Sequence, residues 1–206
     1  MKIKYPRTHH LSWSKGATFD DKTLKDDSCF MGKEVVVTEK LDGENSTLAQ
    51  DYYHARSLDS RDHASRSWIK NYHTTFQRDI PEGWRVCGEN MFAKHSIHYT
   101  DLESYFYVFS IWNEDNICLS WDETVEYCKL LNLCHVPVLW RGLYDHNVLD
   151  NIKIDEISQE GYVIRSAMQF PFDEFNTNVA KYVREKHVQT NQHWMHQTIT
   201  KNELKK

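Results

Sequence analysis

The stretch Thr38-Glu39-Lys40-Leu41-Asp42-Gly43-Glu44-Asn45 decides the fold that we predict for this chain. It follows three consecutive valines at residues 35–37, and a short run of β-branched residues is typical of a buried strand. Asp42-Gly43 favours a tight turn, and residues 46–49 can begin a returning strand. The pattern therefore predicts a β-hairpin that presents Lys40 at a strand end.

Lys40 has two interpretations when it is considered alone. A lysine on a surface hairpin is ordinarily a solvated cation, and the pattern Lys-x-Asp-Gly fixes only three residues. A lysine whose pKa is lowered by burial or by neighbouring cations can instead act as a nucleophile. The motifs that follow along the chain are needed to choose between the two.

Composition sets the class of protein. The 206 residues suffice for one domain with a substantial core, and seven Trp, eleven Tyr and nine Phe can fill it and still leave rings for stacking on planar ligands. The formal net charge of −5 argues against a broad, non-specific grip on nucleic acid but leaves room for local basic tracks. We expect a single domain over residues 1–206, with an irregular cover over residues 1–30 and a short basic tail over residues 185–206.

The cysteines and the apolar runs bear on the compartment. Five cysteines, an odd number without paired spacing, indicate reduced thiols and a cytoplasmic protein. The N-terminus is polar by residue seven and no apolar run reaches the roughly eighteen residues of a membrane span, so we expect neither a signal peptide nor a membrane partner.

A second polar stretch, Arg56-Ser57-Leu58-Asp59-Ser60-Arg61, precedes a predicted helix over residues 62–77. Residues 54–78 hold five basic side chains against two acidic ones. Such charges usually form a solvated helix face. The alternative is a track for phosphate oxygens near Lys40, with Arg61 as the best candidate because a guanidinium grips phosphate with two parallel hydrogen bonds.

The remaining elements are mainly strands. Residues 84–92 read as a strand with Gly88 inside it, which marks a close approach of backbone or ligand, and residues 105–112 form the most strand-like run. Further strands are predicted near residues 136–140, 160–165 and 179–184, and helices from a capping box at Ser120 to about residue 131 and near residues 145–154. This order predicts an α+β fold in which antiparallel sheets form a cleft and helices flank them.

Six short motifs together resemble the covalent nucleotidyltransferase superfamily and, within it, the ATP-dependent RNA ligases. They run in family order from Thr38 to Arg184, and common order is stronger support than any single motif. The six are Lys40-Leu41-Asp42-Gly43-Glu44-Asn45, Ser57-Leu58-Asp59-Ser60-Arg61, Gly88-Glu89, Tyr107-Val108-Phe109-Ser110-Ile111, Glu160-Gly161-Tyr162-Val163-Ile164 and Ala180-Lys181-Tyr182-Val183-Arg184. The resemblance implies an adenylation domain whose sheets enclose a nucleotide.

The resemblance also implies a reaction and its catalytic residues. Lys40 would attack the α-phosphorus of ATP to give lysyl-AMP, AMP would pass to an RNA 5′-phosphate, and an RNA 3′-hydroxyl would displace it. Lys181, Arg61 and a bound Mg²⁺ (or Mn²⁺) would lower the pKa of Lys40 and neutralise phosphate charge. Glu160 would hold the metal ion, because magnesium keeps several waters and needs only one or two carboxylates.

The same resemblance assigns the nucleotide contacts. Phe109 would stack on adenine, and Glu39 would accept a hydrogen bond from the adenine amino group. Glu89 would contact the ribose or a water on the metal ion. Asp42 is placed with the nucleotide-binding residues, and Asn45 would orient the phosphate or the acceptor end.

Three features depart from the family pattern. The closing motif usually has two lysines, whereas here Lys181 stands between Val179 and Val183, with Arg184 as a substitute. Ser110 occupies a position where aspartate is common. The family often appends a domain, but only residues 185–206 follow the closing motif, so we expect RNA joining to depend on this tail or on a partner protein.

Three other functions remain open from the sequence. A capping-type guanylyltransferase shares the Lys-x-Asp-Gly core, although Glu39 argues for adenine. A DNA ligase is disfavoured by Asn45, which is a feature of the RNA-ligase branch. A non-catalytic RNA-binding relative is kept open by the single closing lysine, Lys181.

Overall fold

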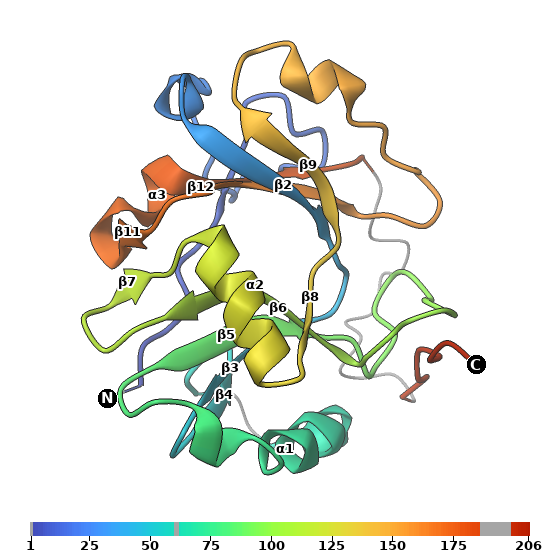
Figure 1. The fold of residues 1–206 in the computed structure, drawn as a ribbon. Helices are drawn as coiled ribbons and strands as arrows, with labels where there is room; N and C mark the ends of the chain where they lie inside the picture. Colours follow the sequence, from blue (N-terminus) through green and yellow to red (C-terminus); the bar gives the residue numbers. More distant parts are fainter. Residues whose placement is uncertain (1, 60–61, 186–198) are drawn as a thin grey trace.

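The strands of the computed structural model form two sheets that face each other, one above the other in Figure 1. The structure describes residues 2–59, 62–185 and 199–206. Pairing within both sheets is mostly antiparallel, which confirms the predicted α+β class. Within the described part of the chain, no helix is both long and apolar enough to cross a membrane.

The first sheet has five strands in the order β1-β12-β10-β2-β9. The valines of β2 are completely buried, because the sheet is covered on both faces. Val35 and Val37 join the core on one face, and Val36 packs into the core that lies between the two sheets. The strands are β1 (His9–His10), β2 (Glu34–Lys40), β9 (Val138–Leu143), β10 (Gly161–Ser166) and β12 (Val179–Val183).

The second sheet has the order β11-β7-β6-β5-β3-β4, with a further short strand, β8, paired to β6. Gly88 lies inside β5 where the register with β6 shifts, and a Cβ there would be 2.5 Å from the Phe106 ring. The predicted close approach at this glycine is thus a contact within the protein. The strands are β3 (Glu44–Ala49), β4 (Tyr53–Ala55), β5 (Arg85–Asn90), β6 (Phe106–Trp112), β7 (Ile117–Cys118), β8 (Cys134–His135) and β11 (Phe170–Pro171).

The predicted hairpin around Asp42-Gly43 is wrong. Strand β2 belongs to the first sheet and β3 to the second, so the turn carries the chain from one sheet to the other. Gly43 is required by packing, because a Cβ at this position would lie 2.6 Å from the carbonyl oxygen of Asn90. Lys40 therefore stands at the point where the two sheets are joined.

One of the predicted helices forms over nearly its full range, and a second is shorter than predicted. Helix α2 (Trp121–Leu130) begins with the predicted capping box of Ser120 and Glu123, and α3 (Phe175–Asn178) is a single turn. Helix α1 (Ser67–His73) replaces the helix predicted over residues 62–77 and is preceded and followed by 3-10 turns at Ala64–Arg66 and Gln77–Asp79. Helices α1 and α2 pack on the outer face of the second sheet through one apolar core.

The helix predicted near residues 145–154 is also wrong. Only a 3-10 turn at Val148–Asn151 forms there. The Asp145 carboxylate accepts a hydrogen bond from the backbone N–H of Asn147, which favours a local turn over a helix start. The apolar periodicity misled the prediction because Leu149, Ile152 and Ile154 pack on the first sheet from an irregular segment.

Buried Arg165 of β10 ties the two sheets together. Its Nη1 donates to the carbonyl of Phe109 in β6 at 3.2 Å, and its Nη2 donates to the carbonyl of Leu119 at 2.7 Å. The guanidinium also lies 5.4 Å from the centre of the Trp121 ring. Since these groups are buried and paired, they fix the spacing of the sheets next to the open cavity described below.

Candidate active site

A cavity of about 510 Å³ opens between the two sheets. The first sheet contributes Glu39 and Lys40 from the end of β2 and Lys181 from β12. The second sheet contributes Asn45 from β3, Glu89 from β5 and Phe109 from β6. Six candidate residues, five of them from four of the six motifs and Glu39 directly before the first motif, therefore surround one space large enough for a small molecule.

Lys40 is held by a carboxylate from the neighbouring strand. Gly161 of β10 is paired with Lys40 in the register of the sheet, which brings Glu160 beside the lysine. The Nζ atom of Lys40 lies 2.6 Å from Oε2 of Glu160. Glu160 is buried, and it lies next to the lysine although its carboxylate is absent from the cavity lining.

The expectation that Lys181, Arg61 and a bound Mg²⁺ lower the pKa of Lys40 stays a prediction, because Arg61 lies outside the described residues. Among the described residues, carboxylates have the larger effect on this lysine. Burial lowers the pKa of the amine, but the carboxylates of Glu160 and Glu89 outweigh burial and hold it above its ordinary value. Lys181 shows the opposite effect. Burial lowers the pKa of Lys181 to about 8, and the positive charge of Lys40 acts in the same direction.

Glu89 is the most perturbed carboxyl of the cavity. Burial raises its pKa to about 8, against the lowering effect of Lys40, and the negative charges of Glu160 and Asp42 raise it further. Crowded carboxylates of this kind are stabilised by a cation. The described residues hold no cluster of three or more His, Cys, Asp or Glu side chains that would suit a closed metal centre.

Asp42 does not line the cavity in this structure. Its Oδ2 accepts hydrogen bonds from the backbone N–H groups of Ser96 at 2.7 Å and Ile97 at 2.9 Å. Its own N–H donates to the Tyr99 hydroxyl at 3.1 Å. The side chain placed with the nucleotide contacts thus anchors the turn after Lys40 to a loop over residues 91–105.

Asn45, Glu39 and Phe109 are side chains of the cavity that could contact a small molecule. The Oδ1 atom of Asn45 is buried and has no hydrogen-bond partner among the described residues, and such atoms are rare unless a ligand completes them. Burial raises the pKa of Glu39, whose side chain is half-buried at the cavity wall. The ring of Phe109 is half-buried at the same cavity and lies edge-on to Tyr5, 5.1 Å between ring centres.

Comparison with known proteins identifies the family. The family model described as RNA ligase matches residues 33–183, which is most of the chain. The chain belongs to the RNA ligase family. No curated protein gives a significant match to this RNA ligase family member.

Solved structures show the same fold. A Naegleria gruberi RNA ligase variant solved with ATP and manganese is 19% identical with a TM-score of 0.56, and the match covers 90% of this chain and 62% of that one. The Naegleria gruberi enzyme with pyrophosphate is 20% identical with a TM-score of 0.56, covering 89% of this chain and 61% of that one. This chain spans less than two thirds of those ligases, and the match establishes an RNA-ligase type of nucleotidyltransferase fold.

The arginine-bearing motif of this RNA ligase family member lies only partly in the described structure. Arg61, the predicted phosphate contact, is outside the described residues. Arg56 lines the cavity instead, and its backbone N–H donates to the carbonyl of Asn45 at 3.0 Å. Sequence reasoning named Arg56 only as one of a group of cations, although its position directly after β4 is the signal that could have placed it.

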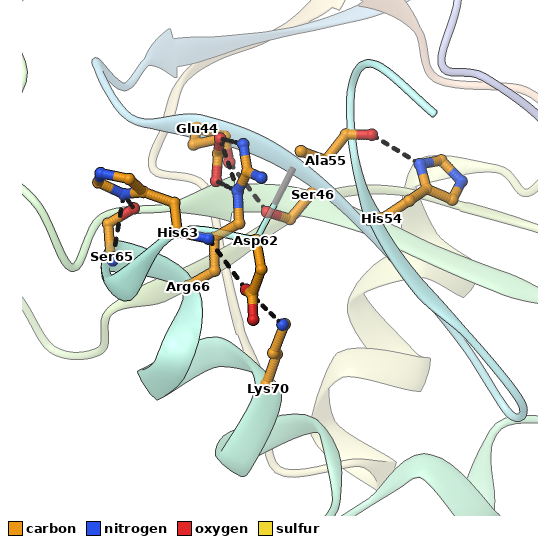
Figure 2. Close-up of polar contacts among 9 residues, drawn as sticks. All are labelled: Glu44, Ser46, His54, Ala55, Asp62, His63, Ser65, Arg66 and Lys70. Carbon is orange, nitrogen blue, oxygen red and sulfur yellow. Dashed lines mark hydrogen bonds and ion pairs between the residues drawn. The ribbon is translucent and has the colours of Figure 1, made fainter. Parts of the chain in front are cut away.

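A second arginine supports the cavity wall. Figure 2 shows the guanidinium of Arg66 against the carboxylate of Glu44, with Nε donating to Oε2 at 2.8 Å and Nη2 donating to Oε1. Both residues line the cavity, and the Arg66 side chain is 4% exposed. By contrast, Lys70 and Asp62 form an exposed pair at the adjacent helix. His95, from the loop that binds Asp42, and Tyr5 complete the cavity lining that sequence reasoning missed.

Proposed function

We propose that this chain is an ATP-dependent RNA ligase that acts through a lysyl-AMP intermediate. The observation that carries the proposal is the position of Lys40, which enters a cavity between the sheets together with Lys181 and beside Glu89 and Glu160. Family membership supports RNA ends as the substrate, a 5′-phosphate and a 3′-hydroxyl. Solved relatives with ATP and manganese support a nucleotide and a divalent cation.

In the first step, the amine of Lys40 attacks the α-phosphorus of ATP. The N–P bond forms, the bond to the bridging oxygen breaks, and pyrophosphate leaves with that electron pair; the lysine ammonium gives two protons to water overall. A pKa near 8 leaves Lys181 a cation at neutral pH, so its charge is available to the phosphate oxygens. Phe109 would stack on the base, and the unpartnered Oδ1 of Asn45 would accept a hydrogen bond from the nucleotide.

Glu160 and Glu89 fit a divalent cation such as Mg²⁺ or Mn²⁺. Glu89 lines the cavity and Glu160 lies beside Lys40 at its edge; burial, together with the negative charges of Glu160 and Asp42, raises the pKa of Glu89. Two carboxylates with water as the remaining ligands are a usual binding site for these ions. When bound, the ion neutralises phosphate charge and withdraws the carboxylate charge that keeps Lys40 protonated.

The next two steps transfer and release AMP. An oxygen of the RNA 5′-phosphate attacks the phosphorus of lysyl-AMP, the P–N bond breaks, and Lys40 takes up two protons to return to its ammonium form. The 3′-hydroxyl of the second RNA end then attacks the 5′-phosphorus, AMP leaves, and the hydroxyl proton is released. These three steps require an open space beside Lys40 for the adenine base. They also require a path along which the RNA phosphates can reach Lys40.

The test is incubation of the protein with α-labelled ATP and Mn²⁺ or Mg²⁺, followed by denaturing electrophoresis. We expect a labelled band that acid removes, that is absent in Lys40→Ala and that persists in Lys129→Ala, a control at an exposed lysine of α2. Labelling by GTP in preference to ATP would favour a capping-type enzyme. A folded protein that neither nucleotide labels would contradict the proposal.

A further inference from the structure

A second cavity of about 660 Å³ lies beside the nucleotide cavity. Tyr5, Pro6 and Lys181 line both spaces, so the second opens directly from the first. We call it the N-terminal groove, because residues 4–7 form one of its sides. Its charged lining residues are Lys4, Arg7, Asp21, Arg56 and Lys181.

The groove carries excess positive charge. It contains four cationic side chains and a single carboxylate, Asp21. Arg7 uses that carboxylate, with Nη2 at 3.1 Å from Oδ1. Among residues 2–59, 62–185 and 199–206, Lys4 and Arg56 form no ion pair and are exposed to solvent. Unpaired cations gathered in a groove favour an anionic ligand.

The N-terminal segment that carries Lys4 and Arg7 is held against the nucleotide cavity by strand pairing and by ring packing. Strand β1 pairs in parallel with β12, His10 opposite Lys181, which sets the N-terminal segment against the closing strand. The half-buried Tyr5 ring packs edge-on against two rings, with 5.1 Å between ring centres to Phe109 and 5.4 Å to Phe175, and this packing holds the backbone between Lys4 and Arg7. The N-terminal groove is therefore continuous with the nucleotide cavity, and ordered contacts hold its walls in place.

We propose that the N-terminal groove binds the phosphates of the polynucleotide strand whose 5′-phosphate receives AMP. This inference rests on the proposed function. Lys181 stands where the groove meets the nucleotide cavity, so a strand with its end at Lys40 would run outward past Arg56 and Lys4. Lys2, two residues before Lys4, adds a further cation to the same N-terminal segment, and its Nζ lies 5.9 Å from the centre of the Tyr52 ring.

A pyrophosphate group shares the phosphate chemistry and is the competing ligand. Pyrophosphate would need cations only next to Lys181, whereas Lys4 and Lys2 extend the charge along the N-terminal segment. An aromatic ring beside a lysine is in addition a feature of single-strand binding surfaces, where bases stack and phosphates pair. The two ligands act in different steps, which allows them to be separated.

The experiment compares Lys4→Ala and Arg7→Gln with wild type and with Lys25→Ala, an exposed lysine outside the groove. Binding of a fluorescent single-stranded RNA with a 5′-phosphate is measured by anisotropy over a range of salt concentrations. We expect each groove variant to weaken binding about tenfold and to reduce the slope of log K against log salt by about 0.7, the value for one lost single-strand phosphate contact. Lys25→Ala should change neither.

Two single-step assays identify the ligand. Formation of lysyl-AMP from ATP should be unchanged in Lys4→Ala, and transfer of AMP from the isolated lysyl-AMP protein to RNA should be slower at limiting RNA. Slower lysyl-AMP formation with normal transfer would assign the groove to pyrophosphate and overturn the inference. Unchanged RNA binding in both groove variants would also overturn it. Since anisotropy needs no adenylation, a wild type that binds RNA but never labels would contradict only the proposed function.

Discussion

Asn202 offers a sharp test of how the active-site turn is supported. The side chain is 1% exposed and lies in the C-terminal segment 199–206. Its Nδ2 donates to the carbonyl of Met91 at 2.7 Å, and its Oδ1 accepts from the N–H of Tyr99 at 3.0 Å. These two contacts hold both ends of the loop over residues 91–99, whose N–H groups bind Asp42. We expect Asn202→Ala to loosen the turn that follows Lys40.

The magnitude follows from the groups that would lose their partners. The substitution leaves the N–H of Tyr99 and the buried carbonyl of Met91 without this partner, at about 1–3 kcal/mol each, so we expect the free energy of unfolding to fall by about 2–6 kcal/mol. For a chain of this length each kcal/mol lowers Tm by roughly 3 °C, which predicts a decrease of about 6–18 °C. Small displacements near reacting groups cost large factors in rate, so lysyl-AMP formation should fall about tenfold or more.

The assay is a thermal melt combined with the rate of labelling by α-labelled ATP at a temperature where both proteins are folded. Lys205→Ala is the matched control, because this residue is exposed in the same segment and uses only its backbone N–H, bonded to the carbonyl of Leu102. Asn202→Asp keeps the acceptor for Tyr99 but loses the donor to Met91, so it should give an intermediate melt. A Tm within 1 °C of wild type, with normal labelling, would refute the reasoning about this segment.

Three further predictions concern the site and its frame. Arg66→Ala leaves the carboxylate of Glu44 buried without its partner and should lower the free energy of unfolding by about 3 kcal/mol in denaturant titration, whereas Lys70→Ala, in an exposed pair, should leave it nearly unchanged. Glu160→Gln removes the carboxylate 2.6 Å from Lys40 and should slow lysyl-AMP formation about 10- to 100-fold and raise the Mn²⁺ concentration needed for half-maximal labelling; a normal metal titration would contradict its assignment as a metal ligand. Gly88→Ala places a methyl group 2.5 Å from the Phe106 ring and should destabilise by about 1–3 kcal/mol, and an unchanged melt would show that β5 and β6 can separate there.

The strands and one helix could be predicted because their signals are local. The valines of β2, the aromatic run of β6 and the capping box of α2 each decide their own conformation from neighbouring residues. The hairpin prediction failed because turn chemistry gives no information on which strand becomes the partner. Gly43 packs closely against the carbonyl of Asn90, a residue far along the chain, at the point where β3 enters the second sheet.

The candidate site divides in the same way. The order of the motifs predicted that Lys40, Glu89 and Lys181 share one site, and in the structure all three line one cavity. Arg7 could be considered from the sequence as a phosphate contact, although a structural role was the more common alternative, whereas no local pattern indicated Tyr5, whose place at the cavity depends on the pairing of β1 with β12. A residue that reaches a site only through tertiary contacts cannot be recognised from the residues next to it in the sequence.

The pKa of Lys40 illustrates why counting charges along a motif is insufficient. The sequence shows Lys181 and several arginines, which suggests a cationic site and an easily deprotonated amine. The register of β10 on β2 instead brings Glu160 within 2.6 Å of Lys40, and the carboxylates of Glu160 and Glu89 raise the pKa of this lysine more than burial lowers it. Under the proposed function, a divalent cation bound at these carboxylates would favour loss of the ammonium protons, so nucleophile activation would be linked to metal binding. This coupling depends on two residues 120 positions apart and becomes visible only through the strand register.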